Sequence, residues 1–244
     1  SSPAPFQTLS HTRAGAKRVY VPQKENEDRV LVREFMPEET GLDVTSILVA
    51  VADGVSRCAD GGAVAEWLLD ARIAKDVVFK PGEGAYLKQF HTYLGNVHAE
   101  FLEEFRSNSE MLESGCTFSA ALVAGPEAAA FWAGDSPIYH LRKEGEGRFH
   151  SRTMAIPDKD RFSGALTDCF SGVTPFKVKQ AGVQTSPGDI LIVVSDGVAY
   201  DGEDLARTLT QRGFTDDWLN SVCQLSFEVP LSDDISLSAV KLPD

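Results

Sequence analysis

Long hydrophobic runs and positive charge are both scarce in this chain of 244 residues. No apolar run approaches the ~18 residues that a helix needs to span a bilayer, and the N-terminal residues lack the apolar core of a signal peptide. These absences predict a soluble, cytoplasmic protein. The first residue is Ser rather than Met, which is typical of a trimmed chain or of a domain excised from a longer one. With 23 Lys and Arg against 36 Asp and Glu, the net charge is −13. Such a chain repels polyphosphate backbones and anionic lipids, so we expect no nucleic acid and no membrane as partner.

Several motifs of known chemistry are also missing. The four cysteines form no C-x-x-C pair, which argues against a zinc or dithiol site and favours free thiols at Cys58, Cys116, Cys169 and Cys223. There is no H-E-x-x-H, no Walker A sequence and no G-x-S-x-G elbow. The segment after Cys58 has no arginine to complete a phosphate-binding cysteine loop. We therefore expect no side-chain nucleophile.

The pattern of apolar residues predicts an α+β fold. Short apolar runs predict strands at residues 46–52, 116–124, 128–133 and 189–194, and residues 235–242 alternate like a half-buried strand. A spacing of three and four predicts helices at residues 63–71 and 86–105, and two short helices are expected at 205–209 and 215–222. Because the strands come in groups rather than alternating with helices, antiparallel sheets are favoured over a parallel sheet.

Acidic residues stand beside most of these strands. Asp53, Asp135 and Asp196 each follow an apolar run, Asp233 and Asp234 precede the last strand, and Glu27 and Asp28 open the first candidate strand. Any one of them is explained by an ordinary Asp turn or cap. Few basic residues stand near them in sequence, namely Arg29 and Arg57, and carboxylates at buried strand ends are costly to desolvate unless they are paired or bind metal. Together, without His or Cys companions, they form an oxygen ligand set that suits Mg²⁺ or Mn²⁺.

Five segments of the chain stand in an order that is typical of one enzyme family. They are NEDRV (26–30), VADGVSRCADGGAVAEWLL, GCTFSAALVAGPEAAAFWAGDSPIYHLR, SPGDILIVVSDGV and SDDISLSAV. In that order they resemble the N-E-D, D-G-x-G-G, G-[ST]-T-A…V-G-D-S-R-x-Y-x-x-R, P-G-D-x-L-L-L-x-S-D-G-L and D-N-I-T-V motifs of the metal-dependent serine/threonine protein phosphatases of type 2C, the PPM family, especially its short bacterial forms. The resemblance runs from Asn26 to Leu242.

This resemblance implies a sandwich of two antiparallel β-sheets flanked by helices (α-β-β-α), with the metal site at one end. It implies a single phosphatase domain over residues 1–244, in which residues 1–20 form an irregular N-terminal segment. The implied cofactors are two Mn²⁺ or Mg²⁺ ions, with a third in many members. By similarity, Asp53 bridges the two metals together with the Gly54 carbonyl, Asp196 and Asp233 complete the first, Glu27 serves the second with Asp28 as a nearby support, and Asp135 holds the third with Asp196. Asp234 stays open as an alternative to Asp233.

The implied activity is the removal of phosphate from phosphoserine and phosphothreonine of proteins, in signalling that is opposed by a serine/threonine kinase. A water activated by the metals attacks the phosphomonoester directly, and Asp53, Asp196 and Asp233 hold the metals that activate it. Two other hypotheses stay open. One is a pseudophosphatase that acts as a regulatory binding module, which the retained carboxylates argue against. The other is a hydrolase of small phosphoesters.

Departures from the family pattern concern the substrate phosphate. The arginine that usually binds this phosphate falls on Gln23, and Lys24 and Arg57 are the candidate substitutes. A lysine offers a point charge in place of the bidentate fork of an arginine. Val55 stands where some members carry a His, and Pro137 replaces the arginine of G-D-S-R. These changes predict a reduced or unusual substrate preference.

Overall fold

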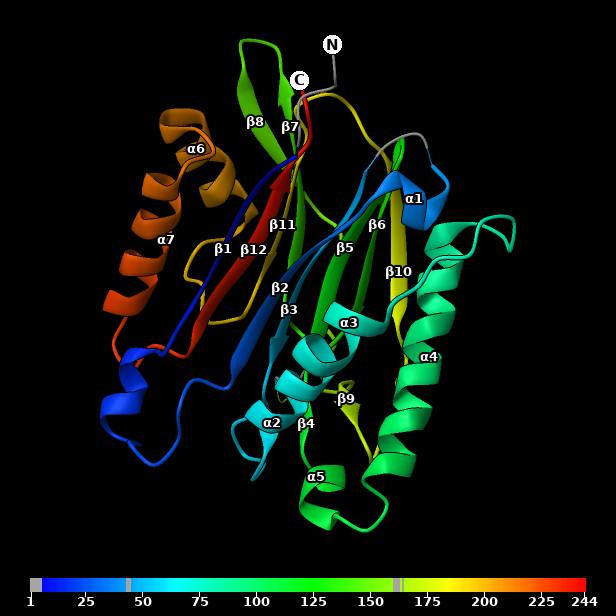
Figure 1. Cartoon of the computed structure of the whole chain (residues 1–244). Coiled ribbons are helices and arrows are strands. Elements are labelled where there is room, and N and C mark those ends of the chain that lie inside the picture. Colours follow the sequence, from blue (N-terminus) through cyan, green and yellow to red (C-terminus); the bar gives the residue numbers. More distant parts are fainter. Residues whose placement is uncertain (1–5, 43–44, 160–162, 164) are drawn as a thin grey trace.

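Two antiparallel sheets face each other at the centre of the computed structural model, which describes residues 6–42, 45–159, 163 and 165–244. The first sheet has the strand order β1-β12-β11-β7-β8. Its strands are β1 (Gln7–Arg13), β7 (Ile138–Glu144), β8 (Arg148–Thr153), β11 (Ile190–Val194) and β12 (Ile235–Lys241). Gln7 of β1 pairs with Lys241 of β12, so this sheet joins segments from the two ends of the chain (Figure 1).

The second sheet has the strand order β10-β6-β5-β3-β2. Its strands are β2 (Asp28–Phe35), β3 (Ser46–Asp53), β5 (Phe118–Ala124), β6 (Glu127–Ala133) and β10 (Lys179–Gln184). The turn between β5 and β6 passes through Gly125, whose φ of 65° lies in the left-handed region that glycine adopts without strain. A two-stranded sheet pairs β4 (Gly115–Cys116) with β9 (Phe170–Ser171).

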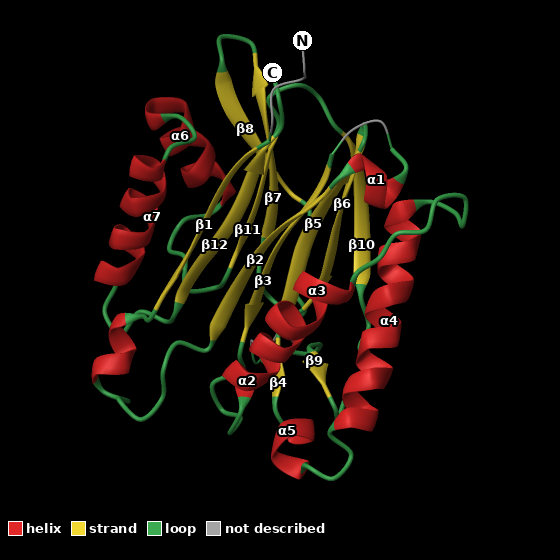
Figure 2. Ribbon diagram, viewed as in Figure 1, coloured by secondary structure: helices red, strands yellow, loops and turns green. Residues whose placement is uncertain are grey.

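Helices cover the outer face of each sheet and complete four layers (Figure 2). On one side lie α6 (Gly202–Arg212) and α7 (Asp216–Glu228). On the other lie α2 (Gly61–Glu66), the π-helical segment η2 (Trp67–Ile73), α3 (Ala74–Asp76) and α4 (Tyr86–Glu104). The short elements are η1 (Ala16–Val19), α1 (Pro37–Thr40) and α5 (Ser109–Glu113). Thr215 caps α7 by accepting a hydrogen bond from the Trp218 N–H at 3.2 Å.

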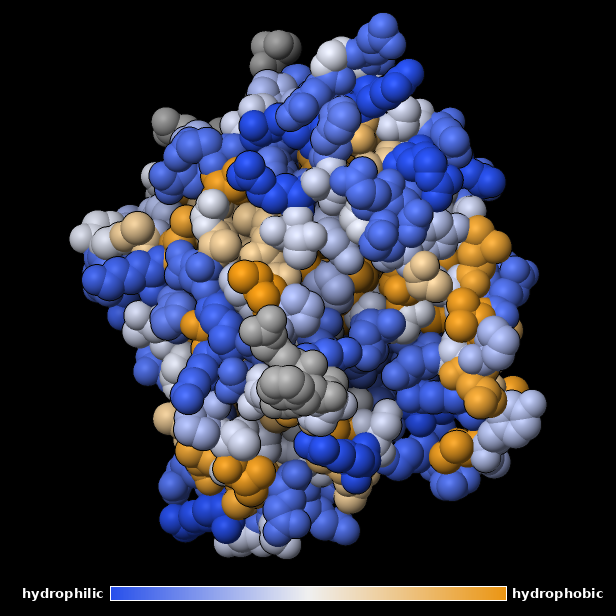
Figure 3. Space-filling view, turned by 180° about the vertical axis from the view of Figure 1, so that it is seen from behind, coloured by the Kyte–Doolittle hydropathy of each residue, from blue (hydrophilic) through white to orange (hydrophobic). Residues whose placement is uncertain are grey.

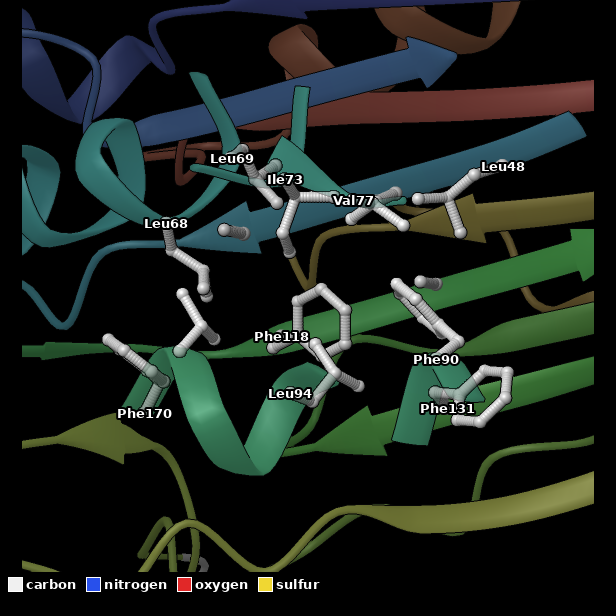
Figure 4. Packing of buried hydrophobic residues seen from close by; sticks show 14 of the residues in the cluster. Leu48, Leu68, Leu69, Ile73, Val77, Phe90, Leu94, Phe118, Phe131 and Phe170 are labelled. Atoms are coloured by element: carbon white, nitrogen blue, oxygen red, sulfur yellow. The ribbon is translucent and has the colours of Figure 1, made fainter. Parts of the chain in front are cut away.

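Three clusters of buried apolar residues hold the layers together. Val49, Val51, Val193 and Val240 belong to the cluster that packs between the two sheets. A second cluster packs α2, η2 and α4 on the outer face of the second sheet, and Figure 4 shows Phe90 and Leu94 of α4 against Phe118 and Phe131 of β5 and β6. A third packs α6 and α7 on the first sheet around Trp218. Seen from behind, the surface is mainly hydrophilic, with hydrophobic atoms in separate patches (Figure 3).

The predicted architecture is confirmed: the fold is an α+β sandwich of two antiparallel sheets flanked by helices. The strands and helices expected from the apolar pattern are present, and the four cysteines are free. One expectation is wrong. The N-terminal segment 1–20 is not irregular where the structure describes it, because it contains β1 and η1. β1 has the sequence QTLSHTR, with few large apolar residues. It is an edge strand, and its pairing with β12 determines its conformation. No helix among the described residues is long and apolar enough to cross a membrane.

Candidate metal centre

Three carboxylates meet where strands of both sheets end. Asp28 is the first residue of β2 and pairs in register with Asp53, the last residue of β3. Asp196 follows β11 of the other sheet after one intervening residue. The carboxyl group of Asp53 lies close enough to those of Asp28 and Asp196 for their charges to raise its pKa. The sandwich therefore brings together, at one end, side chains that are up to 168 positions apart in the sequence.

These three acids resist ionisation. Burial, together with the nearby carboxylates of Asp233 and Asp234, raises the pKa of Asp28 to about 7. Burial and the charges of Asp28 and Asp196 raise the pKa of Asp53 well above its usual range. Partial burial and repulsion from Asp135 and Asp233 raise the pKa of Asp196. Each shift is what a cation bound between the carboxylates would reverse.

One oxygen of Asp28 has no protein partner. Its Oδ2 atom accepts a hydrogen bond from the Ser236 hydroxyl at 2.7 Å, while its Oδ1 atom is buried and unpaired among the described residues. Buried polar oxygens in folded proteins are nearly always satisfied. An unsatisfied carboxylate oxygen beside Asp53 is therefore a position for a cation or for an ordered water.

Glycines allow the backbone after β3 to approach Glu27 and α2. The Gly54 N–H donates to the carbonyl oxygen of Glu27 at 3.1 Å. A Cβ atom on Gly54 would lie 2.6 Å from the carbonyl carbon of Gly61, and one on Gly61 would lie 3.0 Å from Oε2 of Glu27. No larger residue fits at Gly54 without moving this backbone. The D-G and G-G pairs in the sequence thus let the Gly54 backbone, directly after Asp53, and the Gly61 backbone pack against Glu27.

Basic side chains hold four further carboxylates of the cluster. The Lys17 ammonium contacts Oδ1 of Asp233. The Lys159 ammonium lies 2.8 Å from Oδ2 of Asp135. Arg18 donates to Asp234 at 2.5 Å and to Glu27 at 3.2 Å, and Lys24 lies 3.7 Å from Glu27. Lys17, Arg18 and Lys159 were not predicted from the sequence, where only Arg29 and Arg57 stand near these acids. The pairs of Asp233, Asp234 and Asp135 span between 24 and 216 positions, so sequence proximity gave no signal for them.

The two adjacent aspartates before β12 have different roles. Asp234 is 1% exposed and accepts hydrogen bonds from the backbone N–H groups of Gly15 and Glu27 as well as from Arg18. It is fully used in holding the N-terminal segment and Glu27 in place. The side chain of Asp233 is 38% exposed, and its charge raises the pKa of Asp196 as well as that of Asp28, which Asp234 also raises. This geometry favours Asp233 over Asp234 as the residue that faces a metal.

Of the three candidate phosphate ligands, Lys24 contacts the segment that contains Arg57, and Gln23 precedes Lys24 in the sequence. Lys24 reaches the cluster, where its ammonium donates to the carbonyl oxygens of Ser56 at 2.5 Å and Cys58 at 2.9 Å. Gln23 and Arg57 are exposed. Neither makes a recorded side-chain hydrogen bond or ion pair with another described residue.

The donor set fits a hard divalent cation, since every candidate ligand is a carboxylate or carbonyl oxygen and one buried oxygen of Asp28 lacks a partner. Within the described residues, however, no group of three or more His, Cys, Asp or Glu is arranged to hold a metal as it stands. Lys17 and Lys159 engage Asp233 and Asp135, and both would have to release them for these two residues to become ligands.

Comparisons with known proteins return one family and one fold. The family model for protein phosphatase 2C matches residues 36–232. PppA, described as a key regulatory component of T6SS in Pseudomonas aeruginosa, is 24% identical with a TM-score of 0.73, over 98% of this chain and 99% of that one. The serine/threonine phosphatase Stp1 from Staphylococcus aureus is 14% identical with a TM-score of 0.78, over 99% and 97%. The catalytic domain of the phosphatase PstP in complex with two manganese ions is 18% identical with a TM-score of 0.74, over 98% and 99%. No match was found among curated proteins.

Proposed function

Because the chain belongs to the protein phosphatase 2C family and is a serine/threonine protein phosphatase of that type, we propose that its carboxylate cluster binds two divalent cations, Mn²⁺ or Mg²⁺, and hydrolyses phosphoserine and phosphothreonine in proteins. The observation that carries this proposal is the convergence of Asp28, Asp53 and Asp196 from three strand ends, with raised pKa values and one unpaired buried oxygen. The PstP structure with two manganese ions supports the choice of metal.

The ligand roles follow from position. Asp53 lies between Asp28 and Asp196, so we assign it the bridging position, with the Gly54 carbonyl beside it. Asp196 and Asp233 would hold the first cation and Glu27 the second, with Asp28 as support behind Asp53. Asp135 lies close enough to Asp196 to raise its pKa, which suits a third, weaker position. When bound, the cations would activate a water and neutralise the charge of the phosphoryl oxygens.

The chain's own residues would orient the substrate. Lys24 is anchored by two carbonyl oxygens next to Glu27, so it offers a fixed positive charge for the phosphate. Gln23 and Arg57 are both exposed. Gln23 precedes Lys24 in the sequence, and Arg57 lies between the two residues whose carbonyl oxygens Lys24 contacts. We therefore assign both to the outer part of the phosphate site. The substrate phosphoprotein would be one phosphorylated by an opposing serine/threonine kinase. A single domain over residues 1–244 is part of the same proposal.

Turnover of p-nitrophenyl phosphate and of a phosphothreonine peptide tests the proposal. We expect activity with Mn²⁺, none with EDTA, and a loss of at least about 100-fold in Asp53→Asn and Asp196→Asn, since each removes a ligand charge from the site. Asp217→Asn is the matched control, because Asp217 is 85% exposed and lies in α7. Activity that survives EDTA, or Asn variants as active as the control, would contradict the metal mechanism. Binding of a phosphopeptide without turnover would favour the pseudophosphatase.

A further inference from the structure

The described residues include a set of large apolar side chains that face solvent without an evident partner. Six are more than 60% exposed: Val19, Tyr20, Val78, Ile156, Val173 and Leu231. Three of them, Val19 at 75%, Tyr20 at 74% and Leu231 at 64%, belong to two segments that meet beside Asp233. We call these three residues the apolar rim.

Backbone contacts fix the two segments of the apolar rim against each other. The Lys17 N–H donates to the carbonyl oxygen of Ser232 at 3.1 Å, and the Ala16 N–H donates to the Ser232 hydroxyl at 2.8 Å. The Tyr20 N–H then closes the turn on the carbonyl oxygen of Lys17 at 3.0 Å. In Figure 1 this blue turn lies beside the end of α7 and the start of β12. The two segments that carry the rim are thus held together beside Asp233.

The backbone conformation of Leu231 supports a binding role for this surface. It has a φ of 54° and is the only non-glycine residue with a positive φ among those the structure describes. It occupies the third position of the turn 229–232, which follows Pro230 and is closed by the Ser232 N–H on the carbonyl oxygen of Val229 at 3.0 Å. Glycine or asparagine is favoured there. A leucine carries backbone strain and exposes apolar surface at the same position, and strain of this kind gathers at ligand sites.

We propose that the apolar rim binds an apolar side chain next to the phosphorylated residue of a protein substrate. The inference rests on the proposed function and specifies its substrate class. Leu231 is two positions before Asp233, and Val19 and Tyr20 follow Lys17, whose ammonium contacts Asp233 and lies 3.2 Å from the Ser56 hydroxyl. A phosphate at the carboxylate cluster would therefore place the neighbouring residues of an extended chain, at about 3.3 Å per residue, over the rim.

The charges near the apolar rim favour a phosphorylated polypeptide as its ligand. Lys17 and Lys24 both contact Ser56, through its hydroxyl and its carbonyl oxygen, and they lie beside Asp233 and Glu27, so two ammonium groups at the cluster complement a phosphate. An anionic lipid surface would be repelled by a chain of net charge −13. A small phosphoester has no residues to place on the rim. The combination of apolar surface and two lysines fits a phosphopeptide with an apolar neighbour.

The test compares two phosphothreonine peptides that differ only in the flanking residues, leucine or serine, with p-nitrophenyl phosphate as the small substrate. The variants are Leu231→Gly, Tyr20→Ser and, as matched control, Val78→Ser, whose side chain is 71% exposed after α3. For the unchanged chain we expect kcat/KM to be about 10-fold higher for the leucine peptide, as burial of one large apolar side chain allows. Leu231→Gly and Tyr20→Ser should reduce that preference several-fold, and Val78→Ser should keep it.

Leu231→Gly also separates binding from folding. Because glycine relieves the positive φ, the variant should melt at the same or a higher temperature while its peptide preference falls. Equal turnover of the two peptides by the unchanged chain would overturn the proposal. So would rim variants that lose p-nitrophenyl phosphate and peptide activity in the same proportion. A self-associating chain whose dimer is lost in both rim variants, with the peptide preference intact, would assign the rim to a second copy. Absence of turnover on all three substrates would instead refute the proposed function.

Discussion

Substitution of Asp28 by Asn gives the sharpest test of the carboxylate cluster. Asp28 is fully buried, pairs in register with Asp53, and has a pKa of about 7 against a usual value of 3.8. Asn has nearly the same shape as the protonated acid and carries no charge. In the metal-free protein, the Asp28→Asn variant should therefore have, at any pH, a stability similar to that of the unchanged chain with Asp28 protonated.

The sign and size of the effect follow from linkage. A raised pKa means that the folded chain holds the proton more tightly than the unfolded chain, so the stabilisation is complete below about pH 3.8 and is lost as the pH rises towards 7. Between about pH 5 and pH 8 the loss is about 3 kcal/mol, from 1.36 kcal/mol per unit. For a chain of this size that corresponds to roughly 6–12 °C in Tm. Asp53 and Asp196 shift in the same direction and add to the slope.

Thermal melting in EDTA across this pH range is the assay. The unchanged chain should lose stability from about pH 5 to pH 8, and Asp28→Asn should melt at a higher temperature at pH 8 with a smaller slope. The carboxylates with lowered pKa values, Asp189 at about 2 and Asp234, lose their contribution only in more acidic solution and leave this window clear. A flat or rising melting curve for the unchanged chain, or equal slopes for both proteins, would refute the account of the cluster. Mn²⁺ should remove the slope in the unchanged chain and also reduce the smaller slope of the variant, which keeps Asp53 and Asp196.

Three further changes probe the surroundings of the cluster. Gln23→Arg should lower the KM for p-nitrophenyl phosphate about 10-fold by adding a bidentate phosphate ligand, and an unchanged KM would show that Gln23 lies outside the phosphate site. Lys159→Met should raise the affinity for an additional Mn²⁺ several-fold in a calorimetric titration, because its ammonium holds Asp135 at 2.8 Å; equal binding curves would exclude this competition. Asp189→Asn should lower the free energy of unfolding in urea by about 3 kcal/mol, since the buried carboxylate joins Arg142 and His140, and a change below about 1 kcal/mol would contradict it.

The strands that could be predicted are those whose apolar residues form a continuous run or a regular alternation. The runs that became β3, β5, β6, β11 and β12 are apolar because both faces or one face of each strand are buried. The edge strands β1 and β8 were not predicted. The sequence of β8, RFHSRT, buries Phe149 alone, and its neighbour on one side is α6 rather than another strand. Edge strands receive their conformation from the partner they pair with, and no local pattern encodes that partner.

The acidic residues of the candidate site could be predicted from their type and position in the sequence. The contacts that they make with basic residues could not. Strand-end acids such as Asp53 and Asp196 stand out because a carboxylate at the end of a buried strand needs a reason. Their basic neighbours do not stand out, since a lysine in a loop is the commonest surface residue. Lys17 finds Asp233 only because β1 pairs with β12, and this pairing was itself unpredicted. The ion pair between Lys17 and Asp233 was therefore not predicted for the same reason that β1 was not predicted.

The ion pairs also explain where metal is needed. Asp233, Asp135, Glu27 and Asp234 each have a lysine or arginine beside them, and these three bases, Lys17, Lys159 and Arg18, come from the chain itself. Asp28, Asp53 and Asp196 have no ion pair with any described lysine or arginine, and their pKa values are raised. Desolvated acids without a counter-charge either keep a proton or bind a cation. At neutral pH a divalent ion supplies the missing charge most strongly between those three, so the tightest site should form at Asp53, and sites that must first displace Lys17 or Lys159 should be weaker.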